Sequence, residues 1–186
     1  MDIVFYESKT KEVLSTHIIL AKDPTELRKK VNASNEPLII VQGGNDKINK
    51  ESTSMKNVDI LLDPDTDRTK DFMHHKNSGL TIQTAQLANK NEVAIGFSFS
   101  RMLDSTNRPK QIARMHQNVL MCRKYNIDMV LANFSYEEKD QRDLYALKSF
   151  GQILSMRTDE IIDALDFASR RLINKTKKIN HAVKRS

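Results

Sequence analysis

The stretch from residue 71 to residue 79 holds the densest set of side chains that could contact an anion: Asp71-Phe72-Met73-His74-His75-Lys76-Asn77-Ser78-Gly79. Imidazole, ammonium, amide and hydroxyl groups here precede a predicted helix, whose N-terminal amides can hold a phosphate. A simpler role stays open, in which Asn77 or Ser78 only caps that helix. Adjacent histidines point in different directions, so His74 and His75 do not predict a shared metal ion.

Basic side chains surround this stretch and continue beyond it. If the strands form a barrel, they come together as one patch, whose members are Arg68, Lys70, His75, Lys76, Arg101, Arg108, Arg114 and Asn118. Arg114 and Asn118 are four residues apart and share a helix face. Guanidinium groups can hydrogen-bond a phosphate twice. Phe99 and Tyr125 are the aromatic residues near these cations, so the pattern favours recognition of the backbone and shape of structured RNA over stacking on unpaired bases.

Carboxylates that could bind a metal are few at the ends of the apolar runs. Asp63 and Asp65 follow one run, whereas other runs end in uncharged residues such as Gln42 and Asn133. A two-metal phosphoesterase needs several histidine and carboxylate ligands at one place. We therefore expect neither a catalytic residue nor a metal or cofactor site on this chain. A metal-dependent phosphoesterase is kept as the alternative function.

Alternating strands and helices must position these side chains. Apolar runs predict buried strands at 38–41, 58–62, 93–99 and 129–132, with weaker runs at 3–6 and 18–21. Helices are expected after Asp23-Pro24, after Gly79, over 109–125, over 140–150 with Gly151 as the stop, and after Thr158 as the cap. Repeated strand–helix units imply an α/β fold with a parallel sheet, which is either open and doubly wound or a closed or partly closed barrel.

Length, composition and charge bound the class of protein. The chain has 186 residues and a formal net charge of +6, which suits a polyanion as partner. Residues 1–173 are expected to form a single domain, and residues 174–186 a basic, mobile tail. The single cysteine, Cys122, fits a reducing compartment and a buried helix face. Neither a membrane span nor a signal peptide is expected, and the predicted location is cytoplasmic.

Residues 58–152 resemble a known family, ribonuclease P protein component 3, which includes the eukaryotic thirty-kilodalton subunit. The residues that carry the resemblance are His75-Lys76-Asn77-Ser78-Gly79-Leu80, Val93-Ala94-Ile95-Gly96-Phe97-Ser98, Arg114 with Gln117-Asn118-Val119, Arg142-Asp143-Leu144 and Gly151-Gln152-Ile153-Leu154-Ser155-Met156. The chain departs from the family at Thr81-Ile82, where Asn-His is usual, and at Lys76, where Arg is usual.

The resemblance implies a fold, a function and partners. The fold is a (β/α) barrel of the triosephosphate isomerase type, complete or incomplete, related to the polymerase and histidinol phosphatase group. The function is that of an RNA-binding subunit of ribonuclease P, which removes the 5′ leader of precursor tRNA. The RNA subunit catalyses that reaction with Mg2+, and the chain supports it. The implied partners are ribonuclease P RNA, precursor tRNA, protein component 2 and other holoenzyme proteins.

The same resemblance, together with the basic patch, assigns the RNA contacts. These are Arg68, His75, Lys76, Arg101, Arg108, Arg114, Asn118 and Arg142. The apolar stripe of Leu144, Leu147 and Phe150 has two readings, as core or as a partner surface, and core is favoured.

Overall fold

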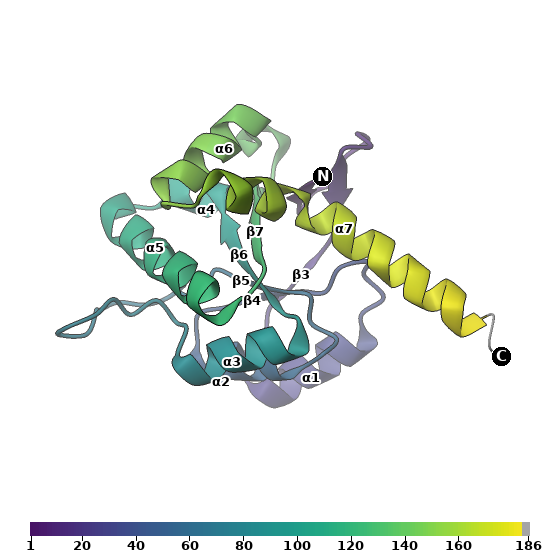
Figure 1. Ribbon diagram of the computed structural model, residues 1–186, viewed down its shortest axis with the longest axis horizontal. Helices are drawn as coiled ribbons and strands as arrows, with labels where there is room; N and C mark the ends of the chain where they lie inside the picture. The colour runs from purple at the N-terminus through teal and green to yellow at the C-terminus, as the bar shows by residue number, and fades with distance from the viewer. Residues whose placement is uncertain (184–186) are drawn as a thin grey trace.

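Parallel strands form the centre of the molecule (Figure 1). The computed structural model describes the backbone of residues 1–183 and the side chains of residues 1–177. Its strands are β1 (Asp2–Val4), β2 (Val13–Ser15), β3 (Ile18–Ile19), β4 (Ile40–Gln42), β5 (Ile60–Leu62), β6 (Ala94–Ser98) and β7 (Met129–Ala132). Strands β3, β4, β5, β6 and β7 lie in that order, and every neighbouring pair is parallel.

The two ends of this sheet are joined through the N-terminal segment. Strand β1 pairs with β2 in parallel. On its other side, Ile3 accepts a hydrogen bond from the amide of Phe134 (2.8 Å), and the Phe5 amide donates to the carbonyl of Ser135 (2.8 Å). Two residues separate β2 from β3, so one stretch of chain pairs first with β1 and then with β4. The strands therefore close into a small barrel, which confirms the predicted TIM-barrel-like class and excludes the open sheet.

Apolar side chains fill the barrel and also separate it from its helices. The interior holds Ile3, Leu38, Ile40, Ile60, Leu62, Ala94, Val130, Ala132 and Phe134. Intervening strand residues such as Val41, Leu61 and Ile95 belong to a second cluster, which includes the buried faces of the helices. Successive side chains of a strand point to opposite faces. Burial on both faces explains why the runs in the sequence are continuously apolar.

Helices cover the outside of the barrel. They are α1 (Pro24–Ala33), α2 (Asp46–Ser54), α3 (Ile82–Asn91), α4 (Phe99–Asp104), α5 (Arg108–Tyr125), α6 (Leu144–Ile153) and α7 (Thr158–Val183), with a 3-10 turn at Glu138–Asp140. Figure 1 shows α1, α2 and α3 grouped along one side of the strands, with α5 and α6 on another. Within the part of the chain that the structure describes, no helix has the length and apolar character needed to cross a membrane.

Several of the predicted helix boundaries are wrong, and the helix expected to begin at residue 140 begins at Leu144. The cap of α3 is Thr81, which forms a capping box with Thr84, and neither Asn77 nor Ser78 caps that helix. Gly151 lies inside α6, and a Cβ at this glycine would come within 2.7 Å of Ile161 Cγ1. A glycine there allows α6 to approach α7 closely, so it does not act as a helix stop.

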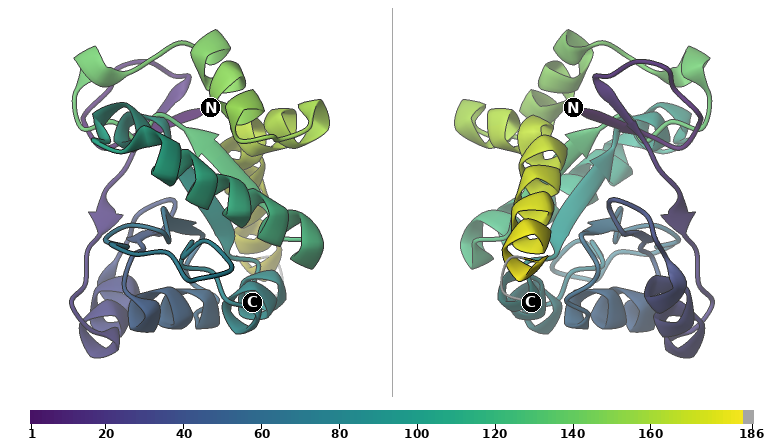
Figure 2. Two further views of the ribbon diagram at one scale, coloured as in Figure 1. Left: turned by 90° about the vertical axis from the view of Figure 1, so that its left-hand side faces the viewer. Right: turned by 90° about the vertical axis from the view of Figure 1, so that its right-hand side faces the viewer.

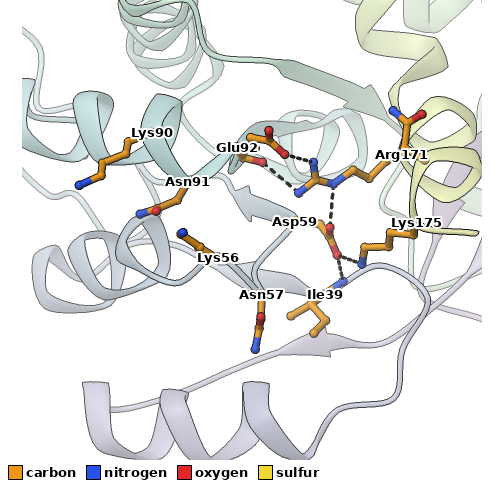
Figure 3. A pocket seen from close by; sticks show the side chains of 10 residues that line it. Ile39, Lys56, Asn57, Asp59, Lys90, Asn91, Glu92, Arg171 and Lys175 are labelled. Atoms are coloured by element: carbon orange, nitrogen blue, oxygen red, sulfur yellow. Dashed lines mark hydrogen bonds and ion pairs between the residues drawn. The ribbon is translucent and has the colours of Figure 1, made fainter. Parts of the chain in front are cut away.

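The amino end of the barrel is closed by α7. Phe167 and Ala168 belong to the interior cluster, and Leu172 packs against it. Asp59, just before β5, accepts hydrogen bonds from the Ile39 amide (2.7 Å), from Arg171 Nε (2.9 Å) and from Lys175 Nζ (Figure 3). Asp59 is buried, so its charge is neutralised by two cations of α7.

The predicted domain boundary at residue 174 falls within α7 and stays a prediction. Lys175 is part of the folded body, and the helix continues through Val183. Figure 1 shows this end of α7 extending beyond the rest of the fold. Mobility of the 174–186 segment stays a prediction, and residues 184–186 lie outside the described residues.

Candidate nucleic-acid interface

The predicted contact residues follow three adjacent strands. Because β5, β6 and β7 are parallel neighbours, the loops after their carboxyl ends meet at one edge of the barrel. Residues 63–81 follow β5, α4 and the start of α5 follow β6, and residues 133–143 follow β7. The structure thus brings the segments that hold the predicted residues to the same edge.

A buried salt bridge of Asp63, Asp65 and Arg101 lies at the centre of this edge. Arg101 donates two hydrogen bonds of 3.1 Å to the carboxylate of Asp65, and its Nη1 lies 3.6 Å from Asp63 Oδ1. The Ser98 amide also donates to Asp63 (3.0 Å). Burial raises the pKa of Asp63 to about 7, with Arg101 opposing the shift and Asp65 adding to it. The predicted contact Arg101 is therefore already engaged within the chain, and its side chain is only partly exposed.

These donors do not fit a two-metal hydrolytic centre. In the part of the chain that the structure describes, no group of three or more His, Cys, Asp or Glu side chains could hold a metal ion. Asp63 and Asp65 are held together by the guanidinium of Arg101, which supplies the positive charge between them. Catalytic metals in such hydrolases need several ligands and an open coordination position. The alternative function as a phosphoesterase therefore gains no support from the geometry.

The segment 68–79, called the 68–79 loop from here on, is fastened by buried side chains of α5. Arg114 donates from Nε to Asp71 Oδ1 (2.8 Å) and from Nη1 to the carbonyl of Arg68. Asn118 donates to the carbonyl of Ser78 (2.9 Å). The left view of Figure 2 shows α5 running beside this loop. These bonds attach both ends of the loop to one helix.

Two predicted RNA contacts therefore have a different position from the one expected. Arg114 is 6% exposed and Asn118 is fully buried, so neither presents its polar group to solvent in this structure. Helical spacing put them correctly on one face of α5, but the 68–79 loop covers that face. Their observed contacts hold the loop that carries His75 and Lys76.

The remaining predicted contacts are at or near the surface. His75 and Lys76 are exposed on the 68–79 loop, and Lys76 Nζ lies 3.5 Å from Asp71. Arg68 is largely covered, and its Nη2 bonds Asp46 (2.6 Å). Arg108 and Arg142 are exposed and donate to backbone carbonyls of their own segments.

Phe72 was not among the predicted contact residues. It is 56% exposed and stacks on His75, with ring centroids 4.5 Å apart. Three-residue spacing in a loop gives no periodic signal, so the sequence alone did not indicate that these rings meet. The clue in the sequence was an aromatic residue, Phe72, within a mostly polar loop.

The fold and its exposed side chains define a closed (β/α) barrel protein whose carboxyl edge carries the cations Lys76, Arg108 and Arg142. The family model described as RNase P subunit p30 matches residues 4–181. The chain belongs to this family, which confirms the resemblance seen in the sequence.

Curated relatives agree with this membership. Ribonuclease P protein component 3 of Methanosarcina mazei is 28% identical over 163 residues, which cover 86% of this chain and 65% of that protein. The protein of the same name from Methanococcus maripaludis strain C7 is 27% identical over 184 residues, which cover 95% of this chain and 71% of that protein. The chain thus spans about two thirds of the length of these relatives.

A solved structure shares the fold. A chain in the cryo-EM structure of archaeal ribonuclease P with mature tRNA superposes with a TM-score of 0.74 at 23% identity. The match covers 86% of this chain and 68% of that one. At this identity the likeness is one of architecture.

Proposed function

We propose that this chain is an RNA-binding subunit of ribonuclease P and supports the RNA that removes the 5′ leader of precursor tRNA. The family membership carries the proposal. The chain contributes a preformed cationic edge, while Mg2+ is held by RNA and the active site belongs to RNA. Its partners are ribonuclease P RNA, precursor tRNA, protein component 2 and the other holoenzyme proteins, in the cytoplasm.

The carboxyl edge of the barrel supports this role by its charge and its rigidity. Lys76 and Arg142 are exposed there on loops, and Arg108 is exposed at the start of α5. Each cation that meets a phosphate releases condensed counterions, which makes binding favourable and dependent on salt. The 68–79 loop is fixed by Arg114 and Asn118 before RNA arrives. A surface that is already ordered loses less conformational entropy on binding.

The buried bridge of Asp63, Asp65 and Arg101 suits support better than catalysis. It ties the loop after β5 to the first turn of α4 after β6. The Arg101 side chain is partly exposed, but both of its Nη atoms already bond Asp65. Its main role in the proposal is to hold the two loops in register.

Reconstituted processing of precursor tRNA tests the proposal. Ribonuclease P RNA and the remaining holoenzyme proteins of the source organism are assembled with and without this chain, and cleavage is measured across a Mg2+ titration. We expect the chain to increase cleavage and lower the Mg2+ requirement. Unchanged cleavage at every Mg2+ concentration would show that the chain is not a functional subunit.

A matched pair of variants then tests the interface. The double variant Lys76→Ala/Arg108→Ala removes two cations from the carboxyl edge, and Lys29→Ala/Lys50→Ala removes two exposed cations from α1 and α2. If both cations of the edge contact phosphates, the salt slope of RNA binding falls by about one per contact in the first variant. Equal losses in both variants would indicate attraction by net charge alone.

A further inference from the structure

The geometry points to a stacking platform for an unpaired RNA base on the 68–79 loop, formed by the Phe72–His75 pair. This inference rests on the proposed function and names the part of the RNA that this loop would recognise. The starting observation is the exposed aromatic pair, with centroids 4.5 Å apart and ring planes inclined by 29°. Phe72 is 56% exposed, so part of its ring surface is open to another flat group.

The fold holds this pair in place with a network beneath it. Asp71, the residue before Phe72, accepts from Arg114 Nε (2.8 Å) and from the Asn77 amide (3.1 Å). The Phe72 amide donates to the carbonyl of His75 (3.1 Å), which closes the loop on itself. An exposed aromatic side chain on a loop fixed from below is preorganised for stacking, because the ring loses little freedom on binding.

Gly79 fixes the far end of the same loop. Its φ is +80°, and a Cβ there would meet the carbonyl oxygen of Pro64 at 1.8 Å. Asn49 donates to the carbonyls of Pro64 (2.9 Å) and Gly79 (3.1 Å), so the far end of the 68–79 loop is tied to the turn that precedes the loop. The Phe72–His75 pair therefore lies on a loop that hydrogen bonds fix to the rest of the fold at both ends.

A groove beside the pair has room and polar groups for a base. It has a volume of about 660 Å³ and runs from the platform toward the start of α3. Its lining includes Lys76, Gln83 and Gln117 besides the two rings. Glutamine amides can donate to and accept from the edges of a base, and Lys76 can contact a phosphate.

Charge and ring chemistry together select a nucleobase over an apolar protein segment. Arg68, Lys70, Lys76 and Lys110 lie on or against this loop, and the carboxylates of Asp46 and Asp71 are paired with Arg68 and Arg114. Aromatic rings stack on the flat faces of bases, whereas bases in a duplex are covered by their neighbours. The occupant is therefore an unpaired base on a phosphate backbone.

A fluorescent base reports this contact directly. The probe is a single-stranded oligoribonucleotide of about ten residues with 2-aminopurine at its centre, compared with the same strand in a duplex. We expect binding of the unaltered chain to quench the single-stranded probe. In Phe72→Ala the affinity for the single strand should fall roughly tenfold, because one base–aromatic contact is worth about 1–3 kcal/mol. Duplex affinity should stay the same.

Conservative variants separate ring stacking from other effects. Phe72→Tyr keeps the ring and should bind like the parent, whereas Phe72→Leu keeps the apolar surface and should lose the quenching. Tyr145→Ala removes an aromatic ring of similar exposure from α6 and should change neither probe. Equal binding by Phe72→Leu and the parent would overturn the platform in favour of an apolar docking site for protein.

The same measurements distinguish this inference from the proposed function. If the unaltered chain binds both RNA probes and Phe72→Ala weakens neither, the platform is wrong and the RNA-binding role stands. If the unaltered chain binds neither probe at low salt, the proposed function fails together with the platform.

Discussion

Individual residues at the carboxyl edge show how burial changes the role of a charged group. Arg101 and Arg114 are cations that face carboxylates within the chain, at Asp65 and Asp71. Burying a charge is unfavourable unless a partner with good geometry compensates it. Their pairing makes them parts of the scaffold. Lys76 and Arg108 are exposed instead, and their contact with RNA stays a prediction.

The unusual pKa of Asp63 makes the stability of the protein depend on pH. Burial raises this pKa from 3.8 to about 7, so between pH 4 and pH 7 the folded chain holds a proton that the unfolded chain has released. The stability contributed by this carboxyl therefore falls as the pH rises through that window. Asp63→Asn keeps an acceptor for the Ser98 amide and tolerates the local φ of 46°. Relative to the parent, we expect the variant to gain on the order of 1 kcal/mol or more from pH 4 to pH 7.

Urea denaturation at several pH values checks this expectation. Asp67→Asn is the control, because Asp67 also has a positive φ (62°) but is exposed. Its stability difference from the parent should not vary over the same window. If Asp63→Asn instead loses stability relative to the parent as the pH rises, attraction by Arg101 outweighs burial and the sign of the shift is reversed.

Arg114 fastens the 68–79 loop to α5, and its removal should loosen that loop. Removing its guanidinium in Arg114→Ala breaks the bonds to Asp71 and to the Arg68 carbonyl. The amides of Phe72 and Asn77 should then exchange hydrogen at least about tenfold faster, which corresponds to about 1.4 kcal/mol of lost protection. Hydrogen exchange followed by NMR measures this.

Strand amides of β6 and the exposed variant Lys124→Ala serve as references. Exchange in β6 should be unchanged if the effect is confined to the 68–79 loop. Loss of protection in β6 of the same size would mean that Arg114 stabilises the whole fold and not this loop in particular.

The strands were predictable from the sequence, and several helix ends were not. The run 38–41 overlaps β4, and the runs 58–62, 93–99 and 129–132 contain β5, β6 and β7, because strands buried on both faces leave a continuous apolar signal. Strand β2 was missed, since Val13–Ser15 is only partly buried and its sequence is polar around it. Helix ends depend on contacts between elements, which local sequence does not contain.

Part of the candidate site was also predictable from the sequence, and part of it was not. The basic edge was predictable from the spacing of charges along the chain and from the rule that loops after parallel strands meet. Burial of Arg114 and Asn118 was not, because it arises where the 68–79 loop folds back over α5. The Phe72–His75 pair is equally a product of loop conformation.

Packing of α6 against α7 should be sensitive to the size of residue 151. In Gly151→Ala the new methyl group would lie 2.7 Å from Ile161 Cγ1 and 3.1 Å from Leu131 Cδ2. We expect a loss of about 1–3 kcal/mol in the free energy of unfolding. Thermal or chemical denaturation measures it, with Ser149→Ala on the exposed face of α6 as the control.

A double variant identifies the cause of that loss. Ile161→Ala removes the atoms that the new methyl group would meet, so Gly151→Ala/Ile161→Ala should lose less stability than the sum of the single variants. Strict additivity would mean that Gly151 matters for a reason other than its contact with Ile161.

The whole molecule depends on contacts between segments far apart in the sequence. Residues 13–19 complete the ring of strands, and α7 closes the amino end with Phe167 inside and Asp59 bonded to Arg171 and Lys175. Contacts between distant segments therefore join the barrel to its closing helix.

Truncation of Phe167 tests the closing role of α7. Phe167→Ala leaves a cavity at the end of the barrel and should cost about 3–5 kcal/mol in the free energy of unfolding. Ile173→Ala, on the exposed side of the same helix, should change it by less than about 0.5 kcal/mol. Chemical denaturation compares the two, and similar values for both variants would show that α7 adds little to the barrel.

The late position of Phe167 has a consequence for synthesis on the ribosome. The strands of the barrel are synthesised before α7. The amino end of the barrel therefore stays open until Phe167 and Ala168 have left the exit tunnel. Until then, Ile3, Leu38 and Ile60 lack the cover that Phe167 provides at the amino end of the barrel. Chaperones that bind apolar surfaces should therefore have access to this protein during its synthesis. They should dissociate from the chain when α7 emerges from the ribosome.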